Sequence, residues 1–366
     1  MNFVINRTDA IGDFLLTLPM AEFLKKVYPN ATVSFIVSAR NAALIGHCPY
    51  IDDYLVVDAK ESFLTKLGKI KKFFQKHQFQ YYFYVGGDHT ATFLAALWGI
   101  PFRGGLKSRW PSFLFLNKGL RQSRSMVEMH ERDYNLQLLK TLEAQWDFAD
   151  YENYVPKMAL DKATVSTDLG YLKQELELAG YPIHLPWVFI HPGMTGHTLN
   201  WPSENYAKLI LRMSLKSEHQ LFFFISHTPA DEQHLRGLKQ ELSQESYKIL
   251  HKNIYYFNGA KMGLTHYLSI LSHADLFIGP STGTTHLANT LNIPLLALYS
   301  PIKVQSSLRW GPLQKKDHRQ EILYPDVICG EQFKCAGEIC PYYECMEKIE
   351  VNQVADKALK LLKIGL

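Results

Sequence analysis

The sequence predicts an α/β protein made of two doubly wound domains, each built on a parallel sheet. Short apolar runs, rich in β-branched and aromatic residues, alternate with longer segments of helical period. This alternation fills the first half of the chain, is interrupted by a polar stretch, and begins again in the second half. A chain of 366 residues is also too long for one ordinary core and suits two.

The expected elements follow from these runs in chain order. In the first half, strands are expected at residues 3–6, 32–37, 54–57, 81–85 and 101–103, with helices at 15–27 and at the lysine-rich 62–77. In the second half, strands are expected at 187–190, 221–225, 254–257, 276–278 and 295–299. Helices are expected there at 203–215, 231–243, 263–273 and 284–291. The first domain is thus expected over 1–165 and the second over 180–350, with a linker around 155–180 that ends in a helical run at 172–179.

Composition excludes several classes of protein. A net charge of +4 and a pI near 8.6 are too weakly basic to indicate nucleic acid, although they suit an anionic membrane surface or an anionic substrate. No apolar run reaches the roughly 18 residues of a membrane span, and the N-terminus lacks the features of a signal peptide. The expected compartment is therefore the cytoplasm, with any contact with the inner membrane peripheral.

The segment 275–286 is the most informative loop, since ligands of such sheets bind beyond the carboxyl ends of the strands. A strand ends there in a small-residue turn that feeds directly into a helix, where free backbone N–H groups favour an anion. The residues of this expected donor-phosphate site are Ser281, Thr282, Gly283, Thr284, Thr285 and His286. An ordinary strand–turn–helix with threonine caps is an alternative that remains open.

Two further loops of the second half carry polar groups. The loop 191–202 is expected to form a second polar concavity through Thr195, Gly196, His197, Asn200 and Trp201, although Trp201 also fits as a packing residue. The loop 226–232 offers Asp231 and Glu232 to ribose hydroxyls. The same two carboxylates also fit a helix start, where acidic residues complement the dipole.

The first half offers one candidate catalytic group. The segment 7–19 contains Arg7, Asp9, Gly12 and Asp13, and Gly12 permits a tight turn after the first strand. Asp13 then stands where the next helix begins, either as an N-cap or as a carboxylate that accepts the proton of an attacking hydroxyl. Both interpretations remain open on the residues alone.

Together these loops resemble the lipopolysaccharide heptosyltransferase family, glycosyltransferases of the GT-B type. The resemblance rests on segments 7–19, 191–202 and 278–288, and on His130-Glu131 with Asn135, all in the family's order. It implies two Rossmann-like domains facing across a cleft, with the acceptor bound by the first and the nucleotide sugar by the second. It also implies that the final helix, 351–366, packs back toward the first domain.

The implied reaction is inverting, metal-independent transfer of heptose from ADP-heptose to the lipopolysaccharide core. Asp13 matches the family's proposed general base, residues 282–286 match its donor-phosphate loop, and Arg7, Asp9 and Gly12 fall on the acceptor side. The family also includes enzymes that glycosylate proteins such as autotransporters. Two departures leave the donor open: Leu199 stands where a lysine is common, and Ser281 where many members have aspartate.

Four of the five cysteines crowd into one short stretch as Cys329, Cys335, Cys340 and Cys345. In a reducing compartment such a cluster favours a structural Zn²⁺ or iron site, although the spacing is not that of common zinc ribbons. Two disulfides or free thiols are alternatives that the sequence leaves open.

Two other classes of function compete with transfer. A sugar-nucleotide epimerase would use the same phosphate loops, but it needs acids placed on the nucleotide sugar, and no motif indicates them. A non-catalytic nucleotide-sugar-binding protein would explain the missing lysine as lost turnover.

Overall fold

The computed structural model describes residues 1–108, 110–143, 146, 153–194, 199–313, 319–330 and 334–362. Two compact units divide the chain, Met1–Ala159 and Leu160–Leu366. Each unit is built on a six-stranded sheet, and every pair of neighbouring strands is parallel. The predicted fold class, two doubly wound α/β units, is confirmed.

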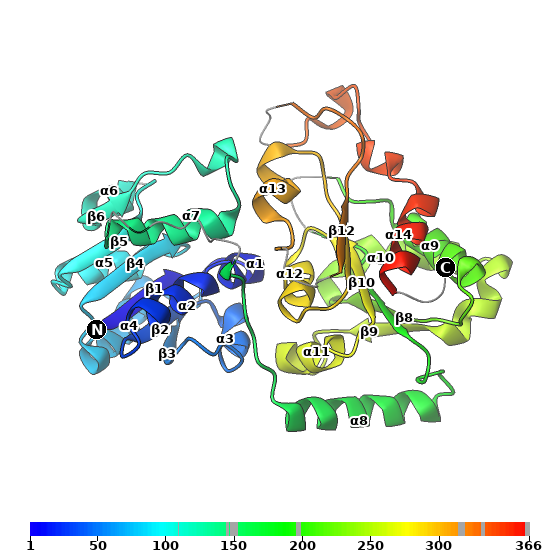
Figure 1. Cartoon of the computed structure of the whole chain (residues 1–366), viewed down its shortest axis with the longest axis horizontal. Coiled ribbons are helices and arrows are strands. Elements are labelled where there is room, and N and C mark those ends of the chain that lie inside the picture. Colours follow the sequence, from blue (N-terminus) through cyan, green and yellow to red (C-terminus); the bar gives the residue numbers. More distant parts are fainter. Residues whose placement is uncertain are drawn as a thin grey trace. The chain divides into compact units, whose positions relative to one another are not determined.

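The first sheet has the strand order β3-β2-β1-β4-β5-β6 (Figure 1). Its strands are β1 (Asn2–Arg7), β2 (Thr32–Val37), β3 (Asp53–Val56), β4 (Tyr81–Gly86), β5 (Phe102–Leu106) and β6 (Lys118–Leu120). The helices of this unit are α1 (Ile11–Leu15), α2 (Leu18–Val27), α3 (Ala39–Ile45), α4 (Phe63–His77), α5 (Thr90–Leu97), α6 (Trp110–Phe115) and α7 (Glu131–Gln137). Short 3-10 turns occupy Arg124–Met126 and Leu138–Thr141.

The second sheet has the order β12-β11-β10-β7-β8-β9. Its strands are β7 (Trp187–Ile190), β8 (Phe222–His227), β9 (Ile254–Asn258), β10 (Leu276–Pro280), β11 (Leu295–Leu298) and β12 (Gln320–Leu323). Its helices are α8 (Lys162–Leu178), α9 (Ser203–Lys216), α10 (Glu232–Leu242), α11 (Gly263–Leu271), α12 (Gly283–Thr290), α13 (Ser307–Trp310) and α14 (Val351–Leu362). Short 3-10 turns lie at Pro229–Asp231, Glu245–Asn253, Lys303–Gln305, Gly337–Ile339 and Cys345–Lys348.

The expected linker is mostly a helix. Helix α8 fills much of the stretch 155–180 and lies beside α11, within the second unit (Figure 1). It starts at Asp161, whose carboxylate accepts a hydrogen bond from the backbone N–H of Thr164 at 2.8 Å. Only Leu172 and Leu176 of this helix are buried, which explains why its pattern resembles that of a polar linker.

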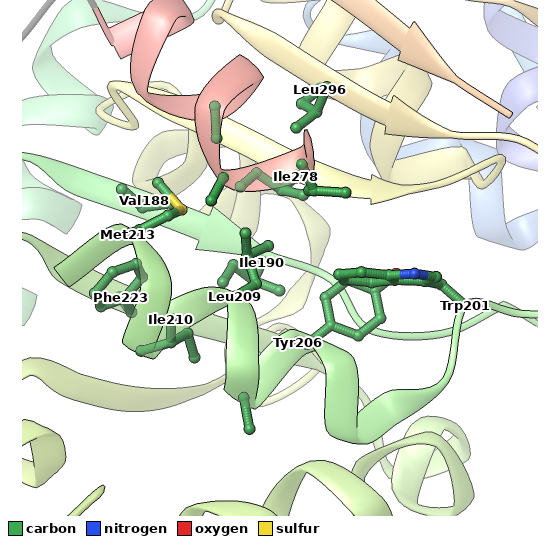
Figure 2. Close-up of a cluster of buried hydrophobic side chains, with 14 of the residues drawn as sticks. Val188, Ile190, Trp201, Tyr206, Leu209, Ile210, Met213, Phe223, Ile278 and Leu296 are labelled. Carbon is green, nitrogen blue, oxygen red and sulfur yellow. The ribbon is translucent and has the colours of Figure 1, made fainter. Parts of the chain in front are cut away.

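One face of the second sheet packs against α9 and α14 (Figure 2). In this core Trp201 meets Tyr206 edge-on at 4.8 Å between ring centroids, and its indole N–H donates to the carbonyl of Ile349 at 2.9 Å. The apolar side chains of α14, such as Val354 and Ala358, are fully buried in the same cluster. The final helix therefore uses its apolar face within the second unit, which differs from the expectation that it packs back toward the first.

Among the described helices, none combines the length and the apolar character needed to cross a bilayer.

Candidate active site

Both sheets change winding direction at one point, and the predicted loops lie there. In the first sheet β1 and β4 are neighbours, and in the second β10 and β7 are neighbours. The chain winds outward in opposite directions from each pair, and ligands of open α/β sheets bind beyond the carboxyl ends of the strands at such a point. In the first unit these are segments 8–13 and 87–89, and in the second, within the described part of the chain, they are 191–194 and 281–283.

In the first unit, the loops after β1 and β4 are joined by a hydrogen bond to Thr8 and pack closely at two glycines. The hydroxyl of Thr8 accepts a hydrogen bond from the backbone N–H of Asp88 at 2.7 Å. Gly87 has φ +83°, and a Cβ there would lie 2.1 Å from the Thr8 hydroxyl; a Cβ on Gly86 would lie 2.4 Å from a carboxylate oxygen of Asp9. Sequence reasoning missed Gly86, Gly87 and Asp88, although a Gly-Gly-Asp run directly after a predicted strand is the signal that marks them.

Asp13 lies on α1 and is bound by Arg7 from the end of β1. An Nη2–H of Arg7 donates to Oδ1 of Asp13, and Nε of Arg7 lies 3.2 Å from Oδ2 of Asp9. The side chain of Arg7 is 4% exposed, whereas that of Asp13 is 24% exposed. Burial alone lowers the pKa of Arg7, but the carboxylates of Asp13, Asp9 and Glu131 outweigh it and raise the pKa. Arg7 thus stays protonated, and Asp13 keeps one edge open to solvent.

The predicted acceptor-side residues differ in what they present. Gly12 is buried, and Arg7 is enclosed and occupied by carboxylates and by the carbonyl of Val85, which accepts from its Nη1 at 2.9 Å. In this structure neither presents a free polar side chain, so their expected contact with the acceptor stays a prediction. Asp9, with its side chain 35% exposed, remains accessible.

Behind Arg7 lies a second buried layer formed by α7 and the turn before it. Glu131 is 1% exposed, accepts a hydrogen bond from Nη1 of Arg124, and lies 3.7 Å from Nη2 of Arg7. The same Nη1 of Arg124 donates to Oδ1 of Asn135 at 2.9 Å, and Nδ2 of Asn135 donates to the carbonyl of Leu16 at 3.0 Å. Helix α1, which carries Asp13, is therefore anchored both through its charge partner and through its carboxyl end.

In the second unit, the loop between β10 and α12 is lined by threonine hydroxyls. Thr282 is the N-cap position of α12, and its hydroxyl lies 2.7 Å from that of Thr284 and 3.4 Å from that of Thr285. The helix starts at Gly283, and no acidic residue occupies its first turn. Thr285 and His286 are buried, while Ser281, Thr282 and Thr284 are partly exposed. The backbone N–H groups and hydroxyls at this helix start suit an anion.

The loop after β7 is closed by Asn200. Its side-chain oxygen accepts from the backbone N–H of Met194 at 3.1 Å, and its Nδ2 donates to the carbonyl of Met194 at 2.9 Å. Three predicted donor residues of this loop, Thr195, Gly196 and His197, lie outside the described part of the chain. Trp201, 1% exposed, packs in the core, which matches the alternative of a packing residue.

Leu199 occupies the position at which a lysine is common in the family. It packs on the edge of the second unit's core and lines the pocket that holds the cysteine cluster.

Asp231 and Glu232 form a helix start. The carboxylate of Asp231 accepts hydrogen bonds from the backbone N–H and the hydroxyl of Thr228, at 2.7 and 2.8 Å. Glu232 is exposed and pairs with Lys239 at 2.8 Å. Asp231 caps the helix and Glu232 forms a surface ion pair. These contacts therefore do not support the predicted role of the two carboxylates in binding ribose.

Three histidines near these loops were not selected from the sequence. His191 is buried, and its Nδ1 donates to the carbonyl of Ser226 at 3.0 Å. Burial lowers its pKa, the field of Asp231 opposes that effect, and His234 and His227 are close enough to lower the pKa further. His234 lies against Gly193, where a Cβ would fall 2.3 Å from the histidine's own Cβ. Only the position of each histidine after a strand or at a helix start could have indicated them.

The four clustered cysteines line a single pocket together with Leu199. They form no disulfides, and burial together with the neighbouring thiols raises the pKa of Cys345. Backbone N–H groups donate to two sulfurs, Gly337 to Cys335 and Tyr342 to Cys340, both at 3.4 Å. In the described ranges, however, no group of three or more His, Cys, Asp or Glu side chains is arranged to hold a metal ion. Metal binding would require the thiols to converge further.

Two doubly wound units in one chain, with polar loops at each change of winding, are the architecture of the GT-B fold class. The chain belongs to glycosyltransferase family 9 (heptosyltransferase), whose family model matches residues 68–334.

Two relatives from Haemophilus influenzae match most of the chain. One, provisionally assigned as a glycosyltransferase, is 27% identical over 86% of this chain and 86% of its own length. The other, the lipopolysaccharide core heptosyltransferase OpsX, is 22% identical over 86% of this chain and 82% of its own.

Solved structures share the fold. The ADP-heptose lipopolysaccharide heptosyltransferase II of E. coli matches with a TM-score of 0.75 and 16% identity, over 99% of this chain and 98% of that one. A family 9 glycosyl transferase from Veillonella parvula matches with a TM-score of 0.78 and 19% identity, over 99% and 97%. The dodecameric iron-containing heptosyltransferase TibC, solved with ADP-D-β-D-heptose, matches with a TM-score of 0.52 and 13% identity, over 98% and 75%.

Proposed function

We propose that this family 9 enzyme transfers a heptose from ADP-heptose to a hydroxyl of the lipopolysaccharide core, by a single displacement that inverts the anomeric centre. The observation that carries the proposal is the half-open carboxylate of Asp13, bound on one side by the enclosed Arg7. Membership of the family supports heptosyl transfer, and the names of OpsX and of the E. coli structure support the core acceptor and the ADP-linked donor.

In this proposal Asp13 is the general base. Oδ1 is held by Arg7, and among the described residues no hydrogen bond is made to Oδ2, which is left to accept the proton of the acceptor hydroxyl. As that proton leaves, the oxygen attacks the anomeric carbon and the bond to the nucleoside diphosphate breaks. Arg7 orients the carboxylate and does not itself touch the acceptor, whereas Asp9 is accessible to it.

The second unit receives the diphosphate in this proposal. The N–H groups at the start of α12 and the hydroxyls of Ser281, Thr282 and Thr284 stabilise the charge that develops on the leaving group. Since Leu199 supplies no charge, we propose that the imidazoles near the β7 loop, His234 foremost, take part of the role that lysine fills elsewhere in the family.

We also propose that the cysteine pocket holds a structural metal ion. Four thiols at one pocket, two of them receiving backbone N–H groups, suit Zn²⁺ or iron once they converge. The iron-containing heptosyltransferase TibC has a similar fold, which is the support that it gives to a metal ion in this chain. Because the cysteine pocket lies beside the core of the second unit, we assign the metal ion no role in the transfer reaction.

A transfer assay tests the main proposal. The purified enzyme is incubated with ADP-heptose and either heptose-free lipopolysaccharide core or a candidate acceptor protein, and the product's anomeric configuration is read by NMR. Heptosylated core of inverted configuration is expected. Transfer only to the protein would show that the acceptor is a protein and not the lipopolysaccharide core. An isomerised donor would indicate an epimerase, and donor binding without turnover would indicate a non-catalytic protein.

A further inference from the structure

Helix α6 presents its apolar side chains to solvent. Trp110 is 74% exposed and Leu114 68%, whereas the small polar Ser112 is fully buried. A short helix of an ordinary globular protein has the opposite arrangement, with large apolar residues inward and serine outward. This inversion needs an explanation, because clustered exposed apolar side chains mark interaction sites.

The exposed apolar surface continues from α6 over the neighbouring helices. The rings of Phe115 and Phe93 lie 5.3 Å apart and those of Phe93 and Phe63 6.0 Å apart, which connects α6 to α5 and α5 to α4. Exposed apolar residues accompany this line of rings: Phe63, Leu64, Leu97, Trp98, Trp110, Phe113 and Leu114. We call these seven residues the apolar face.

The stretch of chain that forms the α5 and α6 part of this face is basic. Residues 89–127 contain six Lys or Arg and no Asp or Glu, although the whole chain carries 35 acidic residues. Lys107 and Arg121 stand over the ring of Phe113, at 5.7 and 5.5 Å from its centroid, and Lys118 is exposed. Cationic groups therefore lie beside exposed aromatic and aliphatic side chains.

We propose that the apolar face is a docking surface for a membrane that contains anionic lipid. Tryptophan and phenylalanine beside lysine and arginine are the combination that partitions into the headgroup region, with rings and leucines toward the acyl chains and cations at the phosphates. Single-stranded nucleic acid fits less well, because bases stack on rings but gain little from the exposed aliphatic side chains of Leu64, Leu97 and Leu114. The proposal is independent of donor and acceptor identity.

Vesicle co-sedimentation tests the proposal on the full chain without donor or acceptor. Wild-type protein is expected to bind phosphatidylcholine vesicles that contain phosphatidylglycerol, to bind pure phosphatidylcholine much more weakly, and to dissociate as salt rises. The double change Trp110→Ser with Leu114→Ser should lower the partition coefficient at least about tenfold. Lys107→Gln with Arg121→Gln should lower it about 25-fold, at about fivefold per basic residue.

The matched control is Leu215→Ser with Ile249→Ser, which removes equally exposed apolar residues from the second unit and should leave binding unchanged. All variants should keep wild-type melting temperatures and wild-type turnover on a water-soluble, deacylated acceptor. The proposal is overturned if wild-type protein binds neither vesicle, if the control variant loses as much affinity as the α6 variant, or if nucleic acid or a protein occupies the face while vesicles do not.

Discussion

Arg7 and Asp13 form an ion pair in which one partner is enclosed and the other half open, since their side chains are 4% and 24% exposed. The enclosed guanidinium fixes the direction of the carboxylate, and the open edge of Asp13 remains available for a proton. A capping carboxylate would point back at its own helix, and no side-chain cap is present at the start of α1. The pair therefore favours the catalytic interpretation of Asp13 over the structural one.

Replacing Asp13 by Asn preserves the size of the side chain and an oxygen for Arg7 but removes the base. We expect kcat to fall by about 10²- to 10⁴-fold, the usual contribution of general base catalysis. The dissociation constant for the donor should change little, because the proposed donor groups belong to the second unit. Initial rates and calorimetric titration with ADP-heptose measure the two quantities. Turnover close to that of the wild type would remove Asp13 from the role.

Glu131→Gln tests the layer behind Arg7. The change leaves two enclosed guanidinium groups without the carboxylate between them, which should cost roughly 3–5 kcal/mol of unfolding free energy. In protein that remains folded at the assay temperature, kcat should drop while KM for the donor stays constant. Lys239→Met, which breaks the exposed pair with Glu232, is the control and should leave the unfolding free energy almost unchanged. Equal effects of the two variants would contradict a positioning role for Glu131.

Gly87 and Gly99 make a matched pair of glycines, since both have positive φ, +83° and +73°. Gly99 has open space where a Cβ would lie, so Gly99→Ala should cost only the backbone strain of about 1–2 kcal/mol. Gly87→Ala places its Cβ 2.1 Å from the Thr8 hydroxyl and should cost clearly more, because the β1 loop has to move. Chemical denaturation of both variants compares them. Identical losses would show that the loops after β1 and β4 are not tightly packed.

His191 predicts a pH dependence of stability. Burial lowers its pKa in the folded state, so between that value and about 6.5 the unfolded chain binds more protons than the folded one. Stability should therefore fall as the pH drops below about 6.5, by at most about 1.4 kcal/mol per pH unit for this group. In His191→Gln the slope between pH 7.5 and 5.5 should flatten, measured by urea denaturation. An unchanged slope would assign the dependence to other groups.

The cysteine pocket predicts a metal content of about one Zn²⁺ or iron per chain in protein purified without chelators under reducing conditions. Elemental analysis measures it, and Cys335→Ser with Cys340→Ser should abolish it. The single change Cys48→Ser, at a buried cysteine far along the sequence from the cluster, should leave the metal content intact. Fewer than about 0.2 metal equivalents per chain in the wild-type protein would show that the four cysteines do not hold a stable metal ion.

The sheets and the location of the candidate site follow from the sequence because both depend on robust patterns. Apolar runs such as 187–190 and 276–278 are buried strands, and the rule that ligands lie beyond strand ends selects the loops. Edge strands β6 and β12 were missed, since three or four partly buried residues give no clear pattern. Of helix α8 only the end, residues 172–179, was expected to be helical, because only two residues of the helix are buried.

Individual roles were harder to predict, since one residue type serves several purposes. Asp231 suits ribose as well as a helix start, and only its bonds to Thr228 decide between them. Trp201 suits a pocket wall as well as a core, and its burial decides. The anchoring of Asp13 through Glu131 and Asn135 spans more than 110 residues of sequence, and no local pattern signals such a contact.

The hydrogen bond from Trp201 to Ile349 ties an early loop of the second unit to the start of its last helix. On the ribosome, the first unit emerges whole while the second is still being made, and it is free to fold first. The second unit cannot complete its core in this way, because α14 covers part of the apolar side of α9 and is made last among its helices. Until α14 has left the exit tunnel, the nascent chain leaves that part of α9 uncovered, and this is the stage at which a chaperone is most needed.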